Sequence, residues 1–213
     1  MSKVYISENT VPLLKDYLTG NGHEIVEMKK STRVYEAISS HPDIFMCKIN
    51  DRMIQAEDDL GVAYPENIQY NGVQIGSLFV HNTDYTAPRL MAAVKDAGLT
   101  PVHVNQGYTK CNVVLVDDHS IITSDAGIST ALLACGIEVL LISPGSIKLT
   151  GYPTGFIGGT SGRIGNTIVF NGDLSEHPDY IPISNFIFDR GLRLQYFEEY
   201  PLEDIGSILE VTP

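Results

Sequence analysis

The sequence is poor in positive charge. Its 14 Lys and Arg residues face 26 Asp and Glu residues, which gives a formal net charge of −12, and the cationic residues are scattered. Nucleic acid and anionic membranes attract positive patches, so this balance argues against both as main partners. No stretch has transmembrane length, and the chain starts without an apolar signal segment. These features predict a cytoplasmic protein.

Cysteine is also scarce, with only Cys47, Cys111 and Cys135 in 213 residues. An odd number of widely spaced cysteines predicts neither a disulfide framework nor a zinc site, and reduced thiols are typical of the cytoplasm. Cys47 lies in a strand-like run and Cys135 at the end of an apolar helix, so we expect both in the core. No metal and no cofactor is expected.

Two common phosphate-binding motifs are missing from the stretch Gly155–Asn166, which has five glycines among twelve residues. No Gly-Lys-Ser/Thr follows, so it is not a P-loop. A strand-like run, Thr167–Phe170, comes next instead of a helix, which excludes a dinucleotide fingerprint. Two interpretations remain open. The loop could hold an anion or oxyanion with its backbone amides, or it could be a β-hairpin with tight turns.

A helix, a glycine and a short strand recur along the chain. The glycines stand where a helix end needs a left-handed residue. Two successive spacings, 76 and 38 residues, differ by a factor of two, which predicts a weak additional copy over Pro65–Ile75. The four glycines are Gly22, Gly98, Gly136 and Gly191.

Pairs of short strands precede several of these helices. Examples are Asn112–Val116 with Ser120–Thr123, and Ile44–Ile49 with Met53–Ala56. A last strand in Gly206–Val211 can pair beside Lys3–Ser7 and close a ring. Repeats of this length imply units that share a core, and no linker divides the chain. We therefore predict an α/β protein of about five strand–strand–helix–strand units in one domain, residues 1–213.

Five such units that close on themselves resemble the pentein fold, the α/β propeller of guanidino-group-modifying enzymes, with repeats around a pseudo-fivefold axis. The chain is also similar to an uncharacterised bacterial family assigned to that fold. The segments that carry this resemblance are His41–Ile44, Gln106–Cys111, Ser120–Asp125, Gly155–Gly165, Asn171–Asp179 and Pro201–Ser207.

The resemblance implies a particular chemistry. Arginine and agmatine deiminases, amidinotransferases and dimethylarginine hydrolases attack a guanidinium carbon with a cysteine thiolate near the C-terminal end of the chain, helped by a histidine and by carboxylates. This sequence departs from the pattern. The comparable turn, Gly158–Arg163, contains neither Cys nor His, no cysteine follows Cys135, and Gln106 stands where a Glu is expected.

The remaining candidates for catalysis are Cys111 with two His-Pro-Asp motifs. The neighbouring Lys110 could stabilise a thiolate at Cys111, although a buried core cysteine is the alternative. His41 with Asp43 could act as an acid/base pair. His177 with Asp179 could do the same, but there turn chemistry and helix capping by Asp179 are favoured.

Further polar residues are candidates for substrate binding. Asp125 is expected to cap a helix, and capping also competes with ligand contact at Asn82 and Asp84. Ser161 is a weak candidate nucleophile, and Arg163 could bind an anion or pair with Asp173. The full predicted binding set is Asn82, Asp84, Gln106, Lys110, Asp125, Gly159, Ser161 and Arg163.

Three functions follow as hypotheses. The first is a divergent hydrolase or transferase that acts on a C–N bond of a guanidine- or amide-containing metabolite, with Cys111 as nucleophile. The second is a catalytically inactive binding or assembly protein that kept the ring. A third function, a structural scaffold that binds another protein through the broad faces of the ring, has the least support. The expected partner is a small polar metabolite, and a homodimer could form.

Overall fold

The recurring element of the chain is an antiparallel strand pair followed by a helix and a third strand, which is parallel to the second. The computed structural model describes residues 2–57 and 59–212, and within these ranges the strands form five small sheets. Three sheets contain the complete unit, so the predicted repeat is confirmed there. The first of these three units consists of β5 (Val73–Ile75), β6 (Leu78–His81), α3 (Pro88–Asp96) and β7 (Thr100–His103). The second consists of β8 (Val113–Asp117), β9 (Ser120–Thr123), α5 (Ala126–Ala134) and β10 (Glu138–Leu141). The third consists of β11 (Ser161–Ile164), β12 (Thr167–Phe170), α6 (Tyr180–Phe188) and β13 (Arg193–Gln195).

The first unit is completed by the C-terminal strand. β1 (Lys3–Ser7) runs parallel to β2 (Glu24–Met28) through the connecting helix α1 (Pro12–Gly20). On its other edge β1 pairs antiparallel with β14 (Leu209–Val211). The predicted pairing between the first and last strands is therefore confirmed, and one sheet contains residues from both ends of the chain.

The second unit is shorter than predicted. β3 (Met46–Ile49) and β4 (Arg52–Gln55) form an antiparallel pair, but the described residues between β4 and β5 form turns instead of a helix. The expectation of a weak copy over Pro65–Ile75 is corrected, because Val73–Ile75 is β5, the first strand of the next sheet. Proline and glycine in this stretch explain the missing helix.

Two strands begin later than predicted because a one-turn helix precedes each of them. α2 (Pro42–Phe45) leads into β3, and α4 (Thr109–Asn112) leads into β8. A proline at the first position favours the helical φ in α2. His41 thus precedes a short helix, not a strand, and Cys111 lies within a helical turn. The remaining short helical turns are η1 (Glu36–Ile38) and η2 (Gly158–Thr160), which leads into β11.

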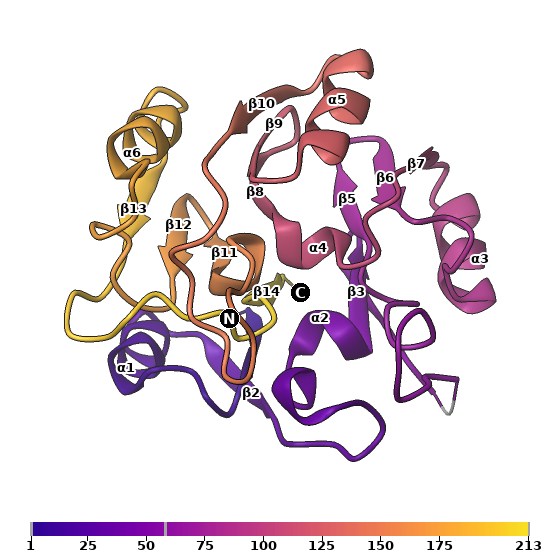
Figure 1. Ribbon diagram of the computed structural model, residues 1–213, viewed down its shortest axis with the longest axis horizontal. Coiled ribbons are helices and arrows are strands. Elements are labelled where there is room, and N and C mark those ends of the chain that lie inside the picture. The colour runs from indigo at the N-terminus through magenta and orange to yellow at the C-terminus, as the bar shows by residue number, and fades with distance from the viewer. Residues whose placement is uncertain (1, 58, 213) are drawn as a thin grey trace.

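The longer helices lie at the periphery, whereas α2 and α4 lie near the middle of the molecule (Figure 1). The predicted glycines after α1, α3, α5 and α6 all have positive φ, between 68° and 82°. Apolar side chains fill the space between helices and sheets, as where Phe170 and Ile122 join Ile183 of α6 in one cluster. Among the described residues, no helix is long and apolar enough to cross a membrane.

Two of the predictions about cysteines have different outcomes. Cys47 is buried in β3, as expected. Cys135 is exposed, which corrects the prediction of a core position. It follows the last residue of α5, and residues 133–136 are all exposed.

The contact between β11 and β14 leads to a test of how the chain ends are joined. A Cβ on Gly162 would overlap the backbone oxygen of Ile208, and the adjacent Ile208 N–H donates to Ser161 O at 2.9 Å. We expect Gly162→Ala to lower the free energy of unfolding by about 1–3 kcal/mol, as overpacking does. The measurement is urea-induced unfolding.

The matched control is Gly20→Ala at the end of α1, where no atom lies within 4 Å of an added Cβ. Because alanine favours a helix, this change should leave stability unchanged or raise it by less than about 1 kcal/mol. Equal effects of the two substitutions would contradict the assigned contact.

Candidate functional site

A cysteine, a carboxylate and an amide meet near the centre of the molecule. The Cys111 thiol donates to Asp43 Oδ2 over 3.1 Å, and Asn71 Nδ2 donates to Cys111 Sγ over 3.2 Å. Asn71 also holds both backbones, since its Oδ1 accepts from Lys110 N at 2.8 Å and its Nδ2 donates to Asp43 O at 3.0 Å. Asn71 therefore joins the turns α2 and α4, whose residues Asp43 and Cys111 are 68 positions apart in the chain.

A lysine and a serine extend this network. Lys110 Nζ donates to Ser207 Oγ at 3.0 Å and to Val113 O at 3.3 Å. Ser207 Oγ donates in turn to Asp43 Oδ2 at 2.6 Å. Lys110, Ser207 and Asp43 are all buried. The cation and the carboxylate thus lie on either side of one hydroxyl.

A histidine and a second carboxylate complete the cluster. His41 Nδ1 lies 3.8 Å from Asp204 Oδ1, and both side chains are buried. Asp204 accepts hydrogen bonds from the backbone N–H groups of Phe156 and Gly206, at 2.9 and 3.0 Å. A ring nitrogen of His41 also lies within 4.8 Å of a carboxylate oxygen of Asp43 and of the Cys111 sulfur, so both carboxylates lie near the imidazole.

Glycines allow these segments to approach one another. A Cβ on Gly159 would overlap the carboxylate of Asp204, and one on Gly206 would overlap His41. The Gly159 carbonyl accepts from Ile205 N and Ser207 N, at 3.0 and 2.8 Å. The glycine-rich stretch therefore packs against the residues that carry the site.

Burial controls the charges of the thiol and its neighbours. It raises the pKa of the Cys111 thiol well above its usual value, and the Asp43 carboxylate adds to this shift. Burial also lowers the pKa of Lys110, while Asp43 opposes that shift. The predicted activation of the thiol by Lys110 is thus corrected, because desolvation and a facing carboxylate outweigh the cation and keep the resting thiol protonated.

The imidazole and the second carboxylate are shifted in opposite directions by the same burial. The pKa of His41 is lowered to about 4, although Asp43 favours its charged form. The pKa of Asp204 is raised to about 6 despite its two backbone hydrogen bonds. Burial also raises the pKa of Asp43. At neutral pH the resting site therefore contains a neutral imidazole, which can accept a proton.

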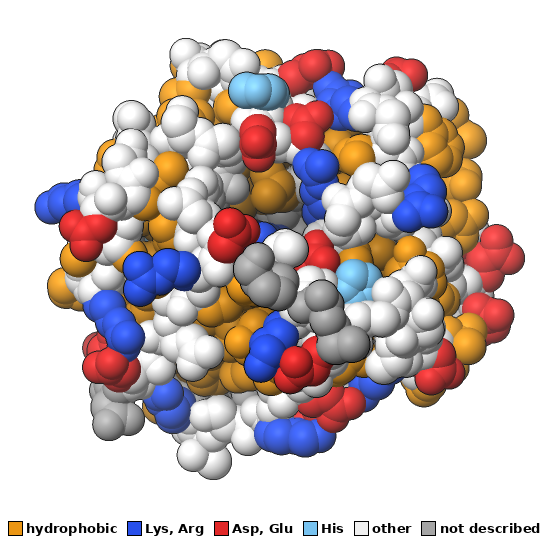
Figure 2. Space-filling view, turned by 180° about the vertical axis from the view of Figure 1, so that it is seen from behind, with side chains coloured by type: hydrophobic (Ala, Val, Ile, Leu, Met, Phe, Trp, Pro, Cys, Tyr) orange, Lys and Arg blue, Asp and Glu red, His pale blue; other side chains and the backbone are white. Residues whose placement is uncertain are grey.

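A cavity reaches this cluster from one face of the molecule. It has a volume of about 710 Å³, and strands of all five sheets contribute to its lining. Lys110 and Cys47 belong to that lining, and Lys48, Arg163, Asp118 and Glu210 supply further charged groups. The corresponding face of the molecule is hollowed in the middle (Figure 2). A small polar molecule in this cavity would therefore lie next to Lys110.

The structure brings some of the predicted site residues together and separates others. Cys111, His41, Asp43, Lys110 and Gly159 all take part in the cluster or pack against it. His177 lies instead in the turn before α6, where its Nδ1 accepts from Asp179 N at 3.1 Å. Asp179 accepts from Ser143 N and makes no capping hydrogen bond to α6, which corrects its predicted role.

Four of the predicted binding residues lie around α3 and α5. Gln106 Nε2 donates to Asp125 Oδ2 at 3.1 Å, and Asp125 Oδ1 accepts from Ile128 N, so the predicted helix cap is confirmed. Asn82 is buried and donates to Asn105 O, whereas Asp84 is exposed. None of these contacts involves Cys111 or Asp43.

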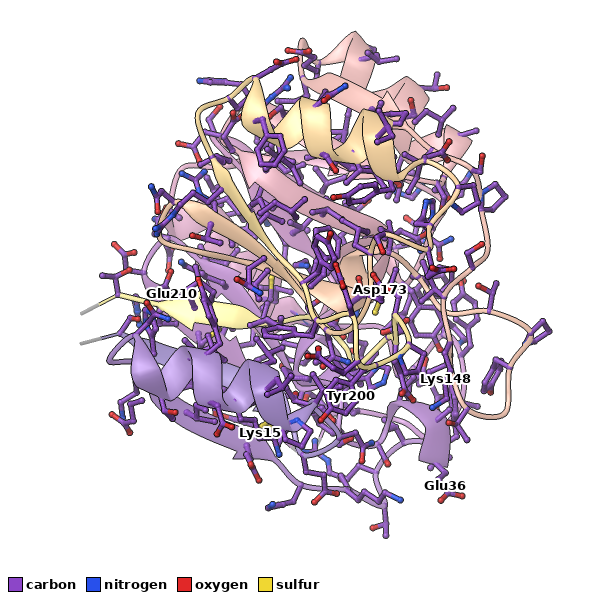
Figure 3. The ribbon with its side chains drawn as sticks, turned by 90° about the vertical axis from the view of Figure 1, so that its left-hand side faces the viewer. Lys15, Glu36, Lys148, Asp173, Tyr200 and Glu210 are labelled. Carbon is purple, nitrogen blue, oxygen red and sulfur yellow. The ribbon has the colours of Figure 1, made fainter. Side chains whose placement is uncertain are left out.

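Ser161 and Arg163 hold the hairpin β11–β12. Ser161 Oγ donates to Gly158 O, and Arg163 donates to Gly165 O and Val116 O. The expected pairing of Arg163 with Asp173 is corrected, since Asp173 accepts from the N–H and hydroxyl of Ser175. Asp173 lies beside Tyr200, whose carbonyl accepts its N–H (Figure 3). The glycine-rich stretch is thus a helical turn followed by a hairpin, and the hairpin also lines the cavity.

Sequence reasoning missed Asn71, Asp204 and Ser207. Ser207 and Asp204 lie in Pro201–Ser207, which contributed to the family resemblance but shows no catalytic motif. Ser207 itself has a positive φ of 69°, rare for a residue other than glycine. Asn71 lies within Pro65–Ile75, the stretch whose pattern predicts a weak additional copy of the repeat. Its adjacency to Gly72 was the available signal, since Asn-Gly pairs mark special backbone turns.

Asp204 gives a testable pH dependence. Its pKa rises from 3.8 to about 6 on folding, so the folded state binds more protons, and this group adds stability as the pH falls from about 6 to about 4. The free energy of unfolding of the wild type minus that of Asp204→Asn should therefore rise by up to about 3 kcal/mol across this window. Urea unfolding at each pH measures it.

The control is Asp16→Asn, a change at an exposed carboxylate of α1. His41 titrates in the same window with the opposite sign, because its lowered pKa favours the folded state at higher pH. It is present in both proteins, so only the change in its pKa that follows the loss of the nearby Asp204 carboxylate remains in the difference. A difference that stays flat for Asp204→Asn would contradict the burial of a shifted carboxyl group.

Solved structures with similar folds were found for this chain. One is DDAH from Pseudomonas aeruginosa, a cysteine-to-serine mutant complexed with citrulline, with a TM-score of 0.58 and 9% identity over 92% of this chain and 91% of that chain. Another is a dimethylarginine dimethylaminohydrolase adduct with 4-chloro-2-hydroxymethylpyridine, with a TM-score of 0.55 and 9% identity over 92% of each chain. The chain thus has an α/β fold similar to that of DDAH, and the predicted pentein resemblance is confirmed.

Comparison of sequences gives the family. No curated protein matches the sequence. A family model described as "Family of unknown function (DUF6873)" matches residues 5–57 and 50–209, which together span nearly the whole chain. The protein therefore belongs to this family of unknown function, DUF6873.

Proposed function

We propose that this protein binds a small polar metabolite in the cavity and acts on a C–N bond of its guanidine or amide group, with Cys111 as nucleophile. The observation that carries the proposal is the Cys111–Asp43 hydrogen bond of 3.1 Å within a buried cluster that also contains His41 and Lys110. A thiol, a carboxylate and an imidazole are the groups that nucleophilic attack on such a carbon requires. The five sheets would form one propeller-like domain around the cavity, along a pseudo-fivefold axis.

Asp43 is placed to take the thiol proton. As Cys111 Sγ bonds to the substrate carbon, the proton moves to Asp43 Oδ2, and Lys110 offsets the negative charge that develops nearby. The C–N bond then breaks, and the departing amine receives a proton from the cluster. Water attacks the carbon of the thioester or thiouronium-type intermediate, the C–S bond breaks, and a proton of that water returns to sulfur, which restores the thiol. The net change is hydrolysis: one water is consumed and one amine is released.

The position of the nucleophile differs from that implied by the resemblance. The thiol comes from the turn before β8 in the fourth sheet along the chain, not from the glycine-rich turn near the C-terminus. Asp204 approaches that turn instead, through the N–H of Phe156. The reaction centre would therefore be displaced within the same fold, and the substrate would be held differently.

A second function, binding without catalysis, is favoured by one observation. Cys111 is 2% exposed and burial raises the pKa of its thiol, so the resting site is closed and uncharged at sulfur. A protein that only binds a ligand or assembles with another copy would need the cavity but not the thiol. The two candidates differ in whether Cys111 is required for turnover.

The experiment is a panel of guanidine- and amide-containing metabolites assayed for released ammonia or amine. We expect turnover by the wild type to fall at least about 1,000-fold in Cys111→Ser, because the nucleophile is lost. Cys47→Ser is the matched control, since Cys47 is equally buried and lines the cavity, and it should retain activity. Thermal shifts that occur without turnover, and that persist in Cys111→Ser, would favour the binding function instead.

Asp43 allows a sharper test, because it should affect reactivity and turnover in opposite directions. Its carboxylate raises the pKa of the Cys111 thiol, so Asp43→Asn should make Cys111 alkylate faster near pH 8. Turnover should fall by about 100-fold or more, because the proton acceptor is lost. Alkylation is measured in a Cys47→Ser, Cys135→Ser background, where Cys111 is the only thiol.

Loss of both alkylation and turnover in Asp43→Asn would indicate that Asp43 only supports the local structure. A far-UV circular dichroism spectrum and an unfolding curve for each variant separate that outcome from the predicted one.

A further inference from the structure

Three side chains of the cluster form a set of metal-ligand types. A ring nitrogen of His41, a carboxylate oxygen of Asp43 and the Cys111 sulfur lie within 4.8 Å of one another, and all three residues are buried. Bond lengths to zinc place the ligand atoms of a tetrahedral site about 3.3–3.8 Å apart. Side-chain rotations that move the ligand atoms by roughly 1 Å would therefore bring the three groups around one cation.

Two atoms of this set have unused bonding capacity. Within residues 2–57 and 59–212, neither Asp43 Oδ1 nor His41 Nδ1 has a hydrogen-bond partner, although both are inaccessible to solvent. Buried polar atoms of native proteins are nearly always paired, so two orphans side by side call for an explanation. A cation that accepts an electron pair from each of these atoms would supply the missing partner.

We propose that His41, Asp43 and Cys111 bind a divalent cation of zinc type, with a fourth position left for water or a ligand. Imidazole, thiolate and carboxylate together suit Zn²⁺ better than Mg²⁺ or Ca²⁺, which prefer all-oxygen sites. The sequence predicts no zinc site because the cysteines are far apart in the chain. Folding brings Cys111 next to the segment His41–Asp43, although Asp43 and Cys111 are 68 residues apart in the chain.

The neighbours of the three ligands resemble the outer shell of a metal site. Asp204 Oδ1 lies 3.8 Å from His41 Nδ1, so a cation at this nitrogen would lie near a second carboxylate, whose negative charge favours it. Asn71 donates to the Cys111 sulfur and Ser207 to Asp43 Oδ2, which fixes both ligands. Lys110 is the opposing charge in these surroundings, and its Nζ donates to the same Ser207 Oγ at 3.0 Å.

The cation and the proposed nucleophile use the same thiol. A bound metal would occupy the Cys111 electron pair, so the metal-loaded protein could not attack a substrate through sulfur. Metal binding does not depend on the proposed reaction, since it needs no substrate and is measured directly. Each idea can therefore fail while the other survives.

The experiment titrates the metal-free full chain with Co²⁺ alone and then with Zn²⁺ alone. We expect one cation per chain, visible absorption bands of tetrahedral cobalt, and a near-ultraviolet sulfur-to-cobalt band. Zn²⁺ should displace Co²⁺ and should slow alkylation of Cys111 at least about 100-fold in the Cys47→Ser, Cys135→Ser background. Binding should release the thiol proton, so the heat of binding should vary with the buffer.

Matched variants assign the ligands. Cys111→Ser should remove the sulfur-to-cobalt band and weaken Zn²⁺ binding by more than about 100-fold, and His41→Gln should weaken it similarly. Cys47→Ser should leave both unchanged. Absence of stoichiometric binding, or binding that survives in both Cys111→Ser and His41→Gln, would overturn the proposal. If either variant fails to fold, protection of wild-type Cys111 by Zn²⁺ still decides the question.

Discussion

The hydrogen bond between Ser207 and Asp43 holds together segments that are 164 residues apart in the chain. It buries a carboxylate between a hydroxyl, a thiol and a lysine, and it requires that the end of the chain return to the turn before β3. The pairing of β14 with β1 provides that return. Because an isolated buried charge is very costly, every partner of Asp43 supports the stability of the centre as well as its chemistry.

The same burial favours the neutral forms of the ionisable groups at the centre. Desolvation favours the neutral forms of the Cys111 thiol, the His41 imidazole and the Asp204 carboxyl group, and it lowers the pKa of Lys110. A cation that enters such a site would favour the ionised forms of the thiol and the carboxyl groups. A substrate with a cationic guanidinium and a divalent cation would both have this effect, so the proposed reaction and the proposed metal site have one electrostatic origin.

Glycines determine how close the segments come. The stretch Gly155–Gly165 contacts Asp204, the turn before β8 and the last strand, and at Gly159 and Gly162 a side chain would overlap these neighbours. Its role in this structure is thus close packing around the cluster. The backbone N–H of Phe156 donates to Asp204, which is a carboxylate of the protein itself. The nearby cavity, lined by strands from all five sheets, links this packing to the solvent.

The sequence by itself determined the repeated unit and the helix ends, because period, glycine position and strand propensity are local properties. It also predicted that the two terminal strands pair, from the ring that the repeats imply, and the folded chain makes that contact. It also identified Cys111, His41, Asp43 and Lys110 as candidates from residue type alone. Only the tertiary structure decided that these four meet, that His177, Gln106 and Asp125 lie elsewhere, and that Asn71, Asp204 and Ser207 join the site. The charge of the thiol was likewise decided by folding, because a cation next to Cys111 in the chain is outweighed by burial and by a carboxylate 68 residues away. Contacts between distant residues and their desolvation arise only when the units close on one another.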